Sequence, residues 1–324
     1  MRILATLALA ITASSPALAD IEQAVEDQIL PGYARFAEAG ETLANAARMD
    51  CAPQQLLPAY YAAYDAWISI SHIQFGPLEA RHFNLAIAFW PDPKDRVGKA
   101  LSRLKADKDV TLSDPGVFRE VSVAAQGFSA LERLLSAPQE DADYACALTR
   151  AITTHLADVA RILHEDWTGG FGEGFVAGKT EVYKTKQEAQ RALYTSLSTG
   201  LEFLHDQRLA RPLGTFDRPR PMRAEARRSE RSLRHVSLSL IALRALAETG
   251  FDATMSDDLR RAFDTAIAQA KGLDDPAMSG VGDPVKRFKI EVLQRMVRDV
   301  QAGVAQDIGA PLGISAGFNA LDGD

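Results

Sequence analysis

Ser129 and Glu132 have the clearest potential for chemistry in this sequence, and they stand one helical turn apart in the segment 126–135. At about 100° per residue on an ideal helix, Glu132 lies roughly 40° from Phe128, within an apolar stripe, and Ser129 lies at the border of that stripe. A carboxylate on a buried face must be paired, coordinated to a metal or protonated. The sequence therefore predicts a specific partner for Glu132, which another part of the chain must supply.

Arginine is concentrated between Arg208 and Arg234, where nine of 27 residues are arginine in an acidic protein. A solvated basic face would hold only surface pairs, each worth under about 1 kcal/mol. Alternatively, one or two arginines meet buried carboxylates such as Glu132, since the planar guanidinium binds a carboxylate bidentately. A third alternative is an anion site for a ligand with a carboxylate or phosphate group. On the helix predicted from residue 223, Arg231 shares one side with Arg227 and Arg234.

The segment 78–93 is predicted to be irregular and carries several reactive side chains, namely Glu79, Arg81, His82 and Trp90. Long irregular segments in compact helical proteins are often functional. We therefore expect this segment to contribute to a site.

Histidine offers few clear metal ligands. The sequence has six histidines but no complete His-Glu-x-x-His zinc motif. His155 and Asp158 stand one turn apart and could share a metal, although this spacing is common by chance. His72 lies at the edge of the apolar stripe of the helix predicted over 55–75, where a histidine is more often hydrogen-bonded in the core. Glu132 and His72 are retained as candidate metal ligands, and no catalytic residue is predicted.

The N-terminus has the pattern of a secretory signal sequence. Arg2 provides the positive charge, residues 3–13 form the apolar segment, and Ala17-Leu18-Ala19 is the small-residue cleavage pattern. This apolar run is too short to span a bilayer, and no later segment is predicted to be transmembrane. We expect residues 1–19 to be removed and the mature chain to be periplasmic or secreted.

Charge and cysteine content limit the classes of partner and compartment. The formal net charge of −7 becomes −8 when Arg2 leaves with the signal sequence, which argues against nucleic acid as a partner. Cys51 and Cys146 would lie in an oxidising compartment, where an even number of cysteines commonly pairs. We predict that they form a disulfide worth about 2–4 kcal/mol. Two buried free thiols are the alternative.

Helical periodicity extends over the mature chain, and no segment shows the alternation of a strand. The sequence therefore predicts an all-α protein of two up-and-down bundles, with a duplication as one possible origin. The glycine-rich segment 169–174 is the best candidate for the boundary between an N-terminal bundle (20–175) and a C-terminal bundle (176–324). The predicted helices cover 21–48 with a break near Pro31, 55–75, 96–105, 115–135, 142–167, 182–208, 223–248, 257–271 and 284–305.

Several motifs together resemble the imelysin family of exported bacterial proteins. The family signature is Gly-x-His-x-x-Glu in a long helix, and the segment from Gly127 to Glu132 stands in its place, with Ser129 where the histidine would be. The other matching motifs are Phe75-Gly76-Pro77, Phe89-Trp90-Pro91, the segments 224–229 and 231–233, and the C-terminal segments 317–319 and 322–324. The resemblance covers nearly the whole mature chain.

The resemblance implies two helical bundles with a candidate site near their interface. The family includes proteins described as insulin-cleaving metallopeptidases and relatives of periplasmic iron-uptake components, and the signature's His and Glu are its proposed metal ligands. A neutral hydroxyl is a poor ligand for zinc or ferrous iron. Ser129 therefore argues against peptidase activity at this site, whereas carboxylates around Glu132 could bind a hard ion such as ferric iron.

We expect a non-enzymatic binding component linked to iron or haem uptake, with a metal ion or an iron-uptake protein as partner and iron or zinc as candidate cofactor. The alternatives are a metallopeptidase of the imelysin type and a structural or adaptor protein in which Glu132 is only salt-bridged. The residues expected to line the ligand or interface site are Ser129, Glu132, Glu79, Arg81, His82, Trp90, Arg228 and Arg231.

Overall fold

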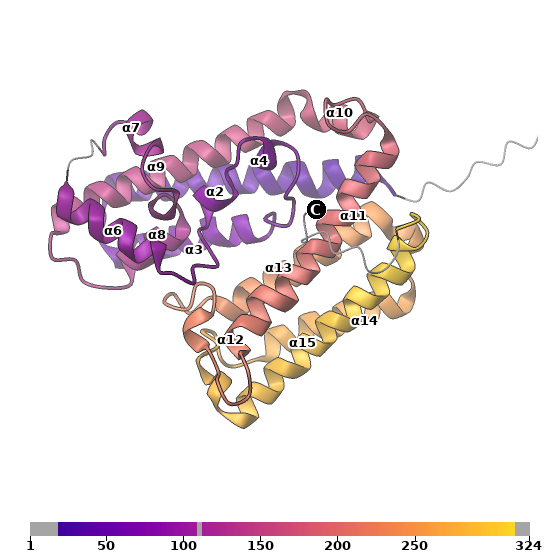
Figure 1. Cartoon of the computed structure of the whole chain (residues 1–324). Coiled ribbons are helices and arrows are strands. Elements are labelled where there is room, and N and C mark those ends of the chain that lie inside the picture. The colour runs from indigo at the N-terminus through magenta and orange to yellow at the C-terminus, as the bar shows by residue number, and fades with distance from the viewer. Residues whose placement is uncertain (1–18, 109–111, 315–324) are drawn as a thin grey trace, which may run out of the picture.

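The computed structural model describes residues 19–108 and 112–314 (Figure 1). Residues 1–18 of the predicted signal sequence and the C-terminal motifs from residue 317 onward lie outside this part of the chain. Within it, the single contact of β type is an isolated bridge between Thr215 and Arg218, and the regular structure is otherwise helical. The predicted all-α class is confirmed.

The N-terminal half is drawn in indigo to pink in Figure 1. Its elements are α1 (Ile21–Gln23), η1 (Ala24–Ile29), α2 (Leu30–Met49), α3 (Pro53–Ile68), α4 (Pro77–Ala80), α5 (Asn84–Ile87), α6 (Arg96–Asp107), α7 (Pro115–Arg119), η2 (Val123–Ala125), α8 (Phe128–Leu135), α9 (Ala142–Asp166), η3 (Trp167–Phe171) and α10 (Gly172–Ala177). α2 packs along α9 on one side and against α3 on another. Gly40 permits this close approach, because a Cβ atom there would lie 3.3 Å from Ala157 Cα.

The C-terminal half is drawn in salmon to yellow in Figure 1. Its elements are α11 (Lys186–Phe203), η4 (Leu204–Ala210), α12 (Arg211–Leu213), η5 (Pro221–Arg223), α13 (Ser232–Phe251), η6 (Asp252–Thr254), α14 (Asp257–Gly272), η7 (Ser279–Gly282), α15 (Pro284–Val304) and η8 (Ala305–Gly309). α13 packs against α11 and α14, and α14 packs against α15. Local sequence sets where these helices begin: Thr185 and Glu188 form a capping box for α11, and Asp283 caps α15 ahead of Pro284.

The two halves share one continuous cluster of buried side chains. α13 contacts α3 and η1, so a long helix of the C-terminal half lies against the N-terminal half. The predicted boundary at 169–174 coincides with a bend at Gly170, which has a φ of 118°. The division into two domains stays a prediction.

The helix predicted over 115–135 is interrupted, because residues 120–127 separate α7 from α8. Gly127 precedes α8 in an extended conformation. A Cβ atom at this position would lie 2.2 Å from Ile87 O and 2.4 Å from Ala86 O, so the backbones touch there. The contact breaks the predicted helix and places the signature residues on a separate short helix.

The helix predicted over 223–248 begins later, at Ser232. Residues 224–231 form irregular turns, in which Ala226 and Glu230 have positive φ angles of 47° and 55°. The prediction of a shared helical face is therefore wrong for Arg227, Arg231 and Arg234.

Two further predictions about helix boundaries are wrong. The helix predicted over 55–75 ends at Ile68, so His72 lies in the turns that follow. The break expected near Pro31 is absent, because η1 leads directly into α2. Pro31 lies just after the π-helical turn of η1, where the regular hydrogen-bond pattern of an α-helix is already interrupted.

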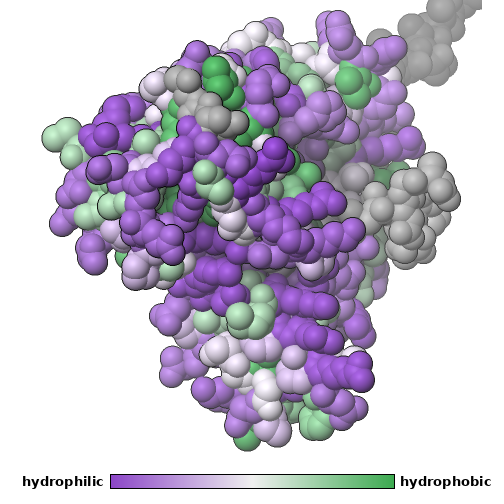
Figure 2. All heavy atoms as spheres, turned by 60° about the vertical axis from the view of Figure 1, so that its left-hand side comes forward, coloured by the Kyte–Doolittle hydropathy of each residue, from purple (hydrophilic) through white to green (hydrophobic). Residues whose placement is uncertain are grey.

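The surface is consistent with a protein whose apolar residues are mostly inside. Figure 2 shows a face on which hydrophilic side chains predominate and apolar ones are scattered. Among the described residues, no helix combines the length and apolar character needed to cross a membrane.

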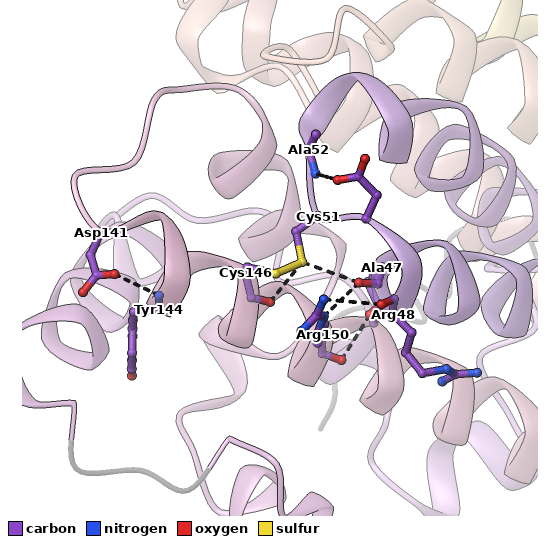
Figure 3. Close-up of a disulfide and its surroundings, with 10 residues drawn as sticks. Ala47, Arg48, Cys51, Ala52, Asp141, Tyr144, Cys146 and Arg150 are labelled. Carbon is purple, nitrogen blue, oxygen red and sulfur yellow. Dashed lines mark hydrogen bonds between the residues drawn. A yellow bond between two sulfur atoms is a disulfide. The ribbon is translucent and has the colours of Figure 1, made fainter.

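Cys51 and Cys146 form the predicted disulfide, with Cα atoms 5.4 Å apart (Figure 3). The bond ties the start of α3 to α9. Arg150 of α9 strengthens the same connection, because its Nε donates to Ala47 O at 3.0 Å and its Nη2 to Arg48 O at 3.3 Å, at the C-terminus of α2. These two carbonyls have no partner within the helix, so a cationic donor there is favourable.

Replacing both cysteines by serine should lower the free energy of unfolding by about 2–4 kcal/mol, because the bond constrains an unfolded loop. The two cysteines are 95 residues apart, which places the effect toward the upper end of that range. Urea unfolding with and without reductant measures it. Reductant should lower the free energy of unfolding of the wild type to that of the double variant and should not change that of the variant. Equal free energies of unfolding for the oxidised wild type and the variant would contradict the prediction.

Gly127→Ala should destabilise the protein by about 2–3 kcal/mol, because the new methyl group would overlap two backbone oxygens that cannot move independently. Gly169→Ala is the matched control, since no atom lies within 4 Å of the Cβ position at Gly169. Urea unfolding of the two variants under identical conditions measures the difference. Similar losses in both would show that the contact with the 84–88 segment is loose.

Candidate functional site

Glu132 lies on α8 with only 7% of its surface exposed. Its Oε1 atom accepts hydrogen bonds from the backbone N–H of Ser229, at 2.9 Å, and from the Ser229 hydroxyl, at 2.8 Å. The N–H of Ser229 is available because the segment 224–231 is not helical. Among the described residues, no arginine forms a salt bridge with Glu132. Its hydrogen-bond partner is therefore a serine from the C-terminal half.

Glu225, in the same segment, is a second buried carboxylate and is 5% exposed. Arg208 donates from Nε to Glu225 Oε2 at 2.7 Å and from Nη1 to the Ser239 hydroxyl at 2.9 Å. Nδ1 of His235 lies 3.1 Å from the same Oε2. Burial raises the pKa of Glu225, but Arg208 and His235 outweigh burial and lower this pKa to about 2. An arginine thus meets a buried carboxylate, and the pair is Arg208 with Glu225.

Stacked aromatic rings connect α3 to α8. Tyr64 stacks on Phe128 with ring centroids 4.4 Å apart and an interplanar angle of 7°, and it meets the edge of His235 at 4.4 Å. Burial raises the pKa of Tyr64 well above its ordinary value, and the carboxylates of Glu225 and Glu132 raise it further. Tyr64 is therefore a neutral group at physiological pH, which is unsuited to act as a phenolate base or ligand.

Two cavities adjoin Glu225. The larger, called the cleft below, has a volume of about 780 Å³. Arg208 and His72 are among its polar lining residues. Its aromatic lining residues are Trp67, Phe75, Trp90, Tyr183 and Phe203.

His72 lines the cleft, and a buried amide fixes its ring. Its Nε2 lies 3.3 Å from Gln28 Nε2, and this amide also donates to Ala242 O at 2.7 Å. Because the amide nitrogen is a donor, His72 Nε2 accepts and the ring proton lies on Nδ1. Nδ1 is buried and has no partner among the described residues. Burial, and to a smaller extent Arg208, lowers the pKa of His72 to about 3, so the ring is neutral.

The smaller cavity, called the arginine pocket below, has a volume of about 270 Å³. It shares Trp90 and Glu225 with the cleft, and Ser129 and Glu132 also line it. Its arginines are Arg133, Arg211, Arg223, Arg227 and Arg228. Its carboxylates are Asp92, Asp95, Glu132 and Glu225, so Ser129 and Glu132 face a cavity that is rich in charges of both signs, with one arginine in excess.

The structure brings five of the predicted site residues to these two cavities. Ser129, Glu132 and Arg228 line the arginine pocket, Glu79 lines the cleft, and Trp90 lines both. Their assembly depends on the fold, because Trp90 comes from an irregular segment and Arg228 from the opposite half.

The other predicted site residues lie elsewhere. Arg81 forms a salt bridge with Asp166 at 2.6 Å, beside a separate surface cavity. His82 is exposed and lines neither the cleft nor the arginine pocket. Arg231 pairs with Asp65, and its guanidinium lies 4.3 Å from the centre of the Tyr61 ring of α3. These three residues line neither the cleft nor the arginine pocket, and their expected role at a site with Glu132 stays a prediction.

Arg208, Glu225 and Ser229 are the residues that the sequence argument missed. Glu225 and Ser229 belong to a motif of the resemblance, which was the available signal. Assigning that motif to a regular helix hid their role, because a helix commits the Ser229 N–H to its own backbone.

The residues around Glu132 do not fit a protein-held zinc or iron site. Such sites take several imidazole, thiolate or carboxylate ligands at short range. Here the neighbours of the carboxylate are hydroxyl groups and arginines, and among residues 19–108 and 112–314 no three His, Cys, Asp or Glu side chains are grouped suitably. His72 lies in the cleft, hydrogen-bonded to an amide, and Asp158 pairs with Arg119 and Arg161.

Comparison with known proteins places these features in context. The model of the family described as Imelysin matches residues 29–304. An imelysin-like protein from Psychrobacter arcticus has a similar structure, with a TM-score of 0.75 and 19% identity over 92% of this chain and 96% of that one. A protein from Parabacteroides distasonis, provisionally named as an iron-regulated protein A precursor, has a TM-score of 0.73 and 13% identity over the same shares. The search of curated protein sequences gave no match.

The burial of His72 predicts a loss of stability in acid. Its pKa is about 3 in the folded state against 6.5 for the free side chain, so between these values the unfolded chain binds one more proton. The free energy of unfolding should fall by about 1.4 kcal/mol per pH unit below pH 6.5 from this residue alone. In His72→Gln that contribution should vanish, which urea unfolding at pH 7 and pH 5 would reveal.

His82→Gln is the matched control, since His82 is exposed. It should keep the pH dependence of the wild type. If His72→Gln showed the same pH dependence of the free energy of unfolding as the wild type, His72 would have to be solvated in the native state.

Proposed function

The chain belongs to the imelysin family, and from this premise we propose that it is an exported, non-enzymatic binding protein linked to iron uptake, whose ligand occupies the cleft. The cleft between α11 and the turns after α3 is the observation that carries this proposal. Its volume of about 780 Å³ lies within the range of cavities that bind small molecules and cofactors. The proposed export rests on the predicted signal sequence.

The lining of the cleft suits a flat or ring-bearing ligand with acidic groups. Trp90 and Phe203 meet edge to face with centroids 5.8 Å apart, and Phe203 also carries the Arg208 guanidinium 5.0 Å above its ring. Aromatic walls bury apolar surface, whereas Arg208 has N–H groups beyond those given to Glu225 and Ser239 and can donate to oxygen atoms. An iron chelate with carboxylates, or haem with its propionates, combines these features. The name of the Parabacteroides distasonis protein adds support for the link to iron.

The arrangement favours binding over catalysis. Among the described residues, no hydrogen bond joins the Ser129 hydroxyl to a histidine, and a serine nucleophile needs such a base. The carboxylate of Glu132 is held by Ser229, and the described residues contain no group of three or more His, Cys, Asp or Glu side chains that could hold a catalytic metal. A metallopeptidase and an adaptor protein without a ligand remain as outcomes of the following test.

Filling the cleft should abolish ligand binding. Thr199 of α11 lines the cleft, and Thr199→Trp places an indole in it. Titration calorimetry with haem, and with ferric citrate in the presence of excess free citrate to saturate any separate citrate site, should give saturable binding of one of them to the wild type. Binding should be at least tenfold weaker in the variant, because the ligand and the indole compete for the same volume.

Thr265→Trp is the matched control. Thr265 is an exposed threonine of α14 whose hydroxyl donates to the carbonyl four residues earlier, as that of Thr199 does. It should bind like the wild type. Binding that survives Thr199→Trp, or no binding of either compound, would overturn the proposed ligand site, and chelator-sensitive peptide cleavage by the pure protein would establish a peptidase instead.

A further inference from the structure

The arginine pocket contains cations that the protein itself neutralises only in part. Each carboxylate in its lining already has donors elsewhere. Asp95 pairs with Arg133 at 2.5 Å, and Asp92 accepts from two N–H groups in the first turn of α6, at 2.8 and 2.9 Å. Glu132 and Glu225 are held by the partners described above. The remaining arginines of the pocket therefore form no salt bridge with these carboxylates, and a bound anion would supply the missing counter-charge.

Four arginines are in this position: Arg211, Arg223, Arg227 and Arg228. In the described part of the chain none of them forms a salt bridge. Arg227 Nε donates to a backbone carbonyl, Met222 O, at 3.2 Å, and Arg211 Nη1 lies 3.3 Å from an amide oxygen, Gln207 Oε1. Arg211 Nε is buried and has no partner among the described residues. Donor atoms are thus available, and at least one is withdrawn from water.

Mutual repulsion among these arginines is visible in their pKa values. Burial lowers the pKa of Arg228, and Arg133 and Arg227 lower it further, while the carboxylates of Glu132 and Asp95 oppose this effect without cancelling it. Burial and then Arg223 lower the pKa of Arg211. Both groups remain charged at physiological pH. Crowded, partly desolvated guanidinium groups destabilise the empty pocket, so a bound anion would gain from relieving the repulsion as well as from hydrogen bonds.

We propose that the arginine pocket is a binding site for a small multivalent oxyanion, either a phosphate or a di- or tricarboxylate. Guanidinium forks match the geometry of carboxylate and phosphate oxygens. The volume of about 270 Å³ lies below the range for drug-sized ligands and suits an ion of a few heavy atoms. Because the pocket shares only Trp90 and Glu225 with the cleft, this inference does not depend on the proposed ligand of the cleft.

The test is titration calorimetry of the full-length mature protein with inorganic phosphate and with citrate, at constant ionic strength. Arg228→Gln should raise the dissociation constant roughly tenfold, and Arg223→Gln combined with Arg228→Gln roughly a hundredfold, because each change removes charge-assisted hydrogen bonds. Both residues are exposed enough for glutamine to be accommodated. Arg35→Gln controls for net charge, because Arg35 is an exposed residue of α2 that lines neither cavity. This variant should bind the anion as the wild type does.

Two further measurements should give effects opposite in sign to the weaker anion binding of the arginine variants. Glu132→Gln should tighten anion binding roughly threefold or more, because it removes the carboxylate that faces the arginines while its oxygen can still accept from Ser229. Without any anion, Arg223→Gln combined with Arg228→Gln should melt at or above the wild-type temperature, since the change relieves repulsion. With saturating anion, the wild type should melt higher than the double variant.

The proposal is overturned if neither anion binds, if the double variant binds as the wild type, or if Arg35→Gln weakens binding equally. It is also overturned if chloride displaces the anion as effectively as phosphate does, because the attraction would then be diffuse. The stronger of the two titrants identifies the source of the oxyanion. Thr199→Trp should keep anion binding, so failure of the cleft and failure of the arginine pocket give different results.

Discussion

Two buried carboxylates, Glu132 and Glu225, impose the constraint on which this architecture depends. An ionised carboxylate away from water is tolerated only when donors surround it, and removing one partner leaves an uncompensated charge. Glu132 belongs to the N-terminal half and takes its donors from Ser229. Glu225, four residues before Ser229, takes its donors from Arg208 and His235. One short segment, 224–231, therefore ties α8 to the C-terminal half.

The same constraint explains why this segment is not helical. In a helix the Ser229 N–H would bond to the carbonyl of Glu225, and it could not reach Glu132. Left-handed backbone at Ala226 and Glu230 turns the chain so that the N–H and the hydroxyl of Ser229 point to one oxygen. Such a conformation costs about 1–2 kcal/mol per non-glycine residue, which charge-assisted hydrogen bonds in a buried site can offset.

The buried network also determines how the two cavities differ. Glu225 and Trp90 line both, but the cleft adds aromatic rings such as Phe203, whereas the arginine pocket adds five arginines and three further carboxylates. Glu132 stands where the sequence comparison predicts the signature glutamate of the family, and Ser129 where it predicts the histidine. The Glu132 carboxylate holds the segment 224–231 through Ser229 and partly balances the charge of the arginines. The Ser129 side chain beside it is smaller than a histidine and occupies less of the arginine pocket.

The sequence alone determined the helical class, the course of helices such as α9, α14 and α15, the disulfide and the burial of Glu132. These properties depend on local periodicity, capping residues and the number of cysteines, which neighbouring residues encode. Only the tertiary structure decided that α8 starts after Gly127 and that Ser229 is the partner of Glu132. Both results require contacts between backbones far apart in the chain: the Ile87 carbonyl against Gly127, and the segment 224–231 against α8. Local helix preference favoured a helix over residues 120–127 and 224–231. Long-range packing outweighed it in the first segment, and the hydrogen bonds that stabilise a buried carboxylate outweighed it in the second.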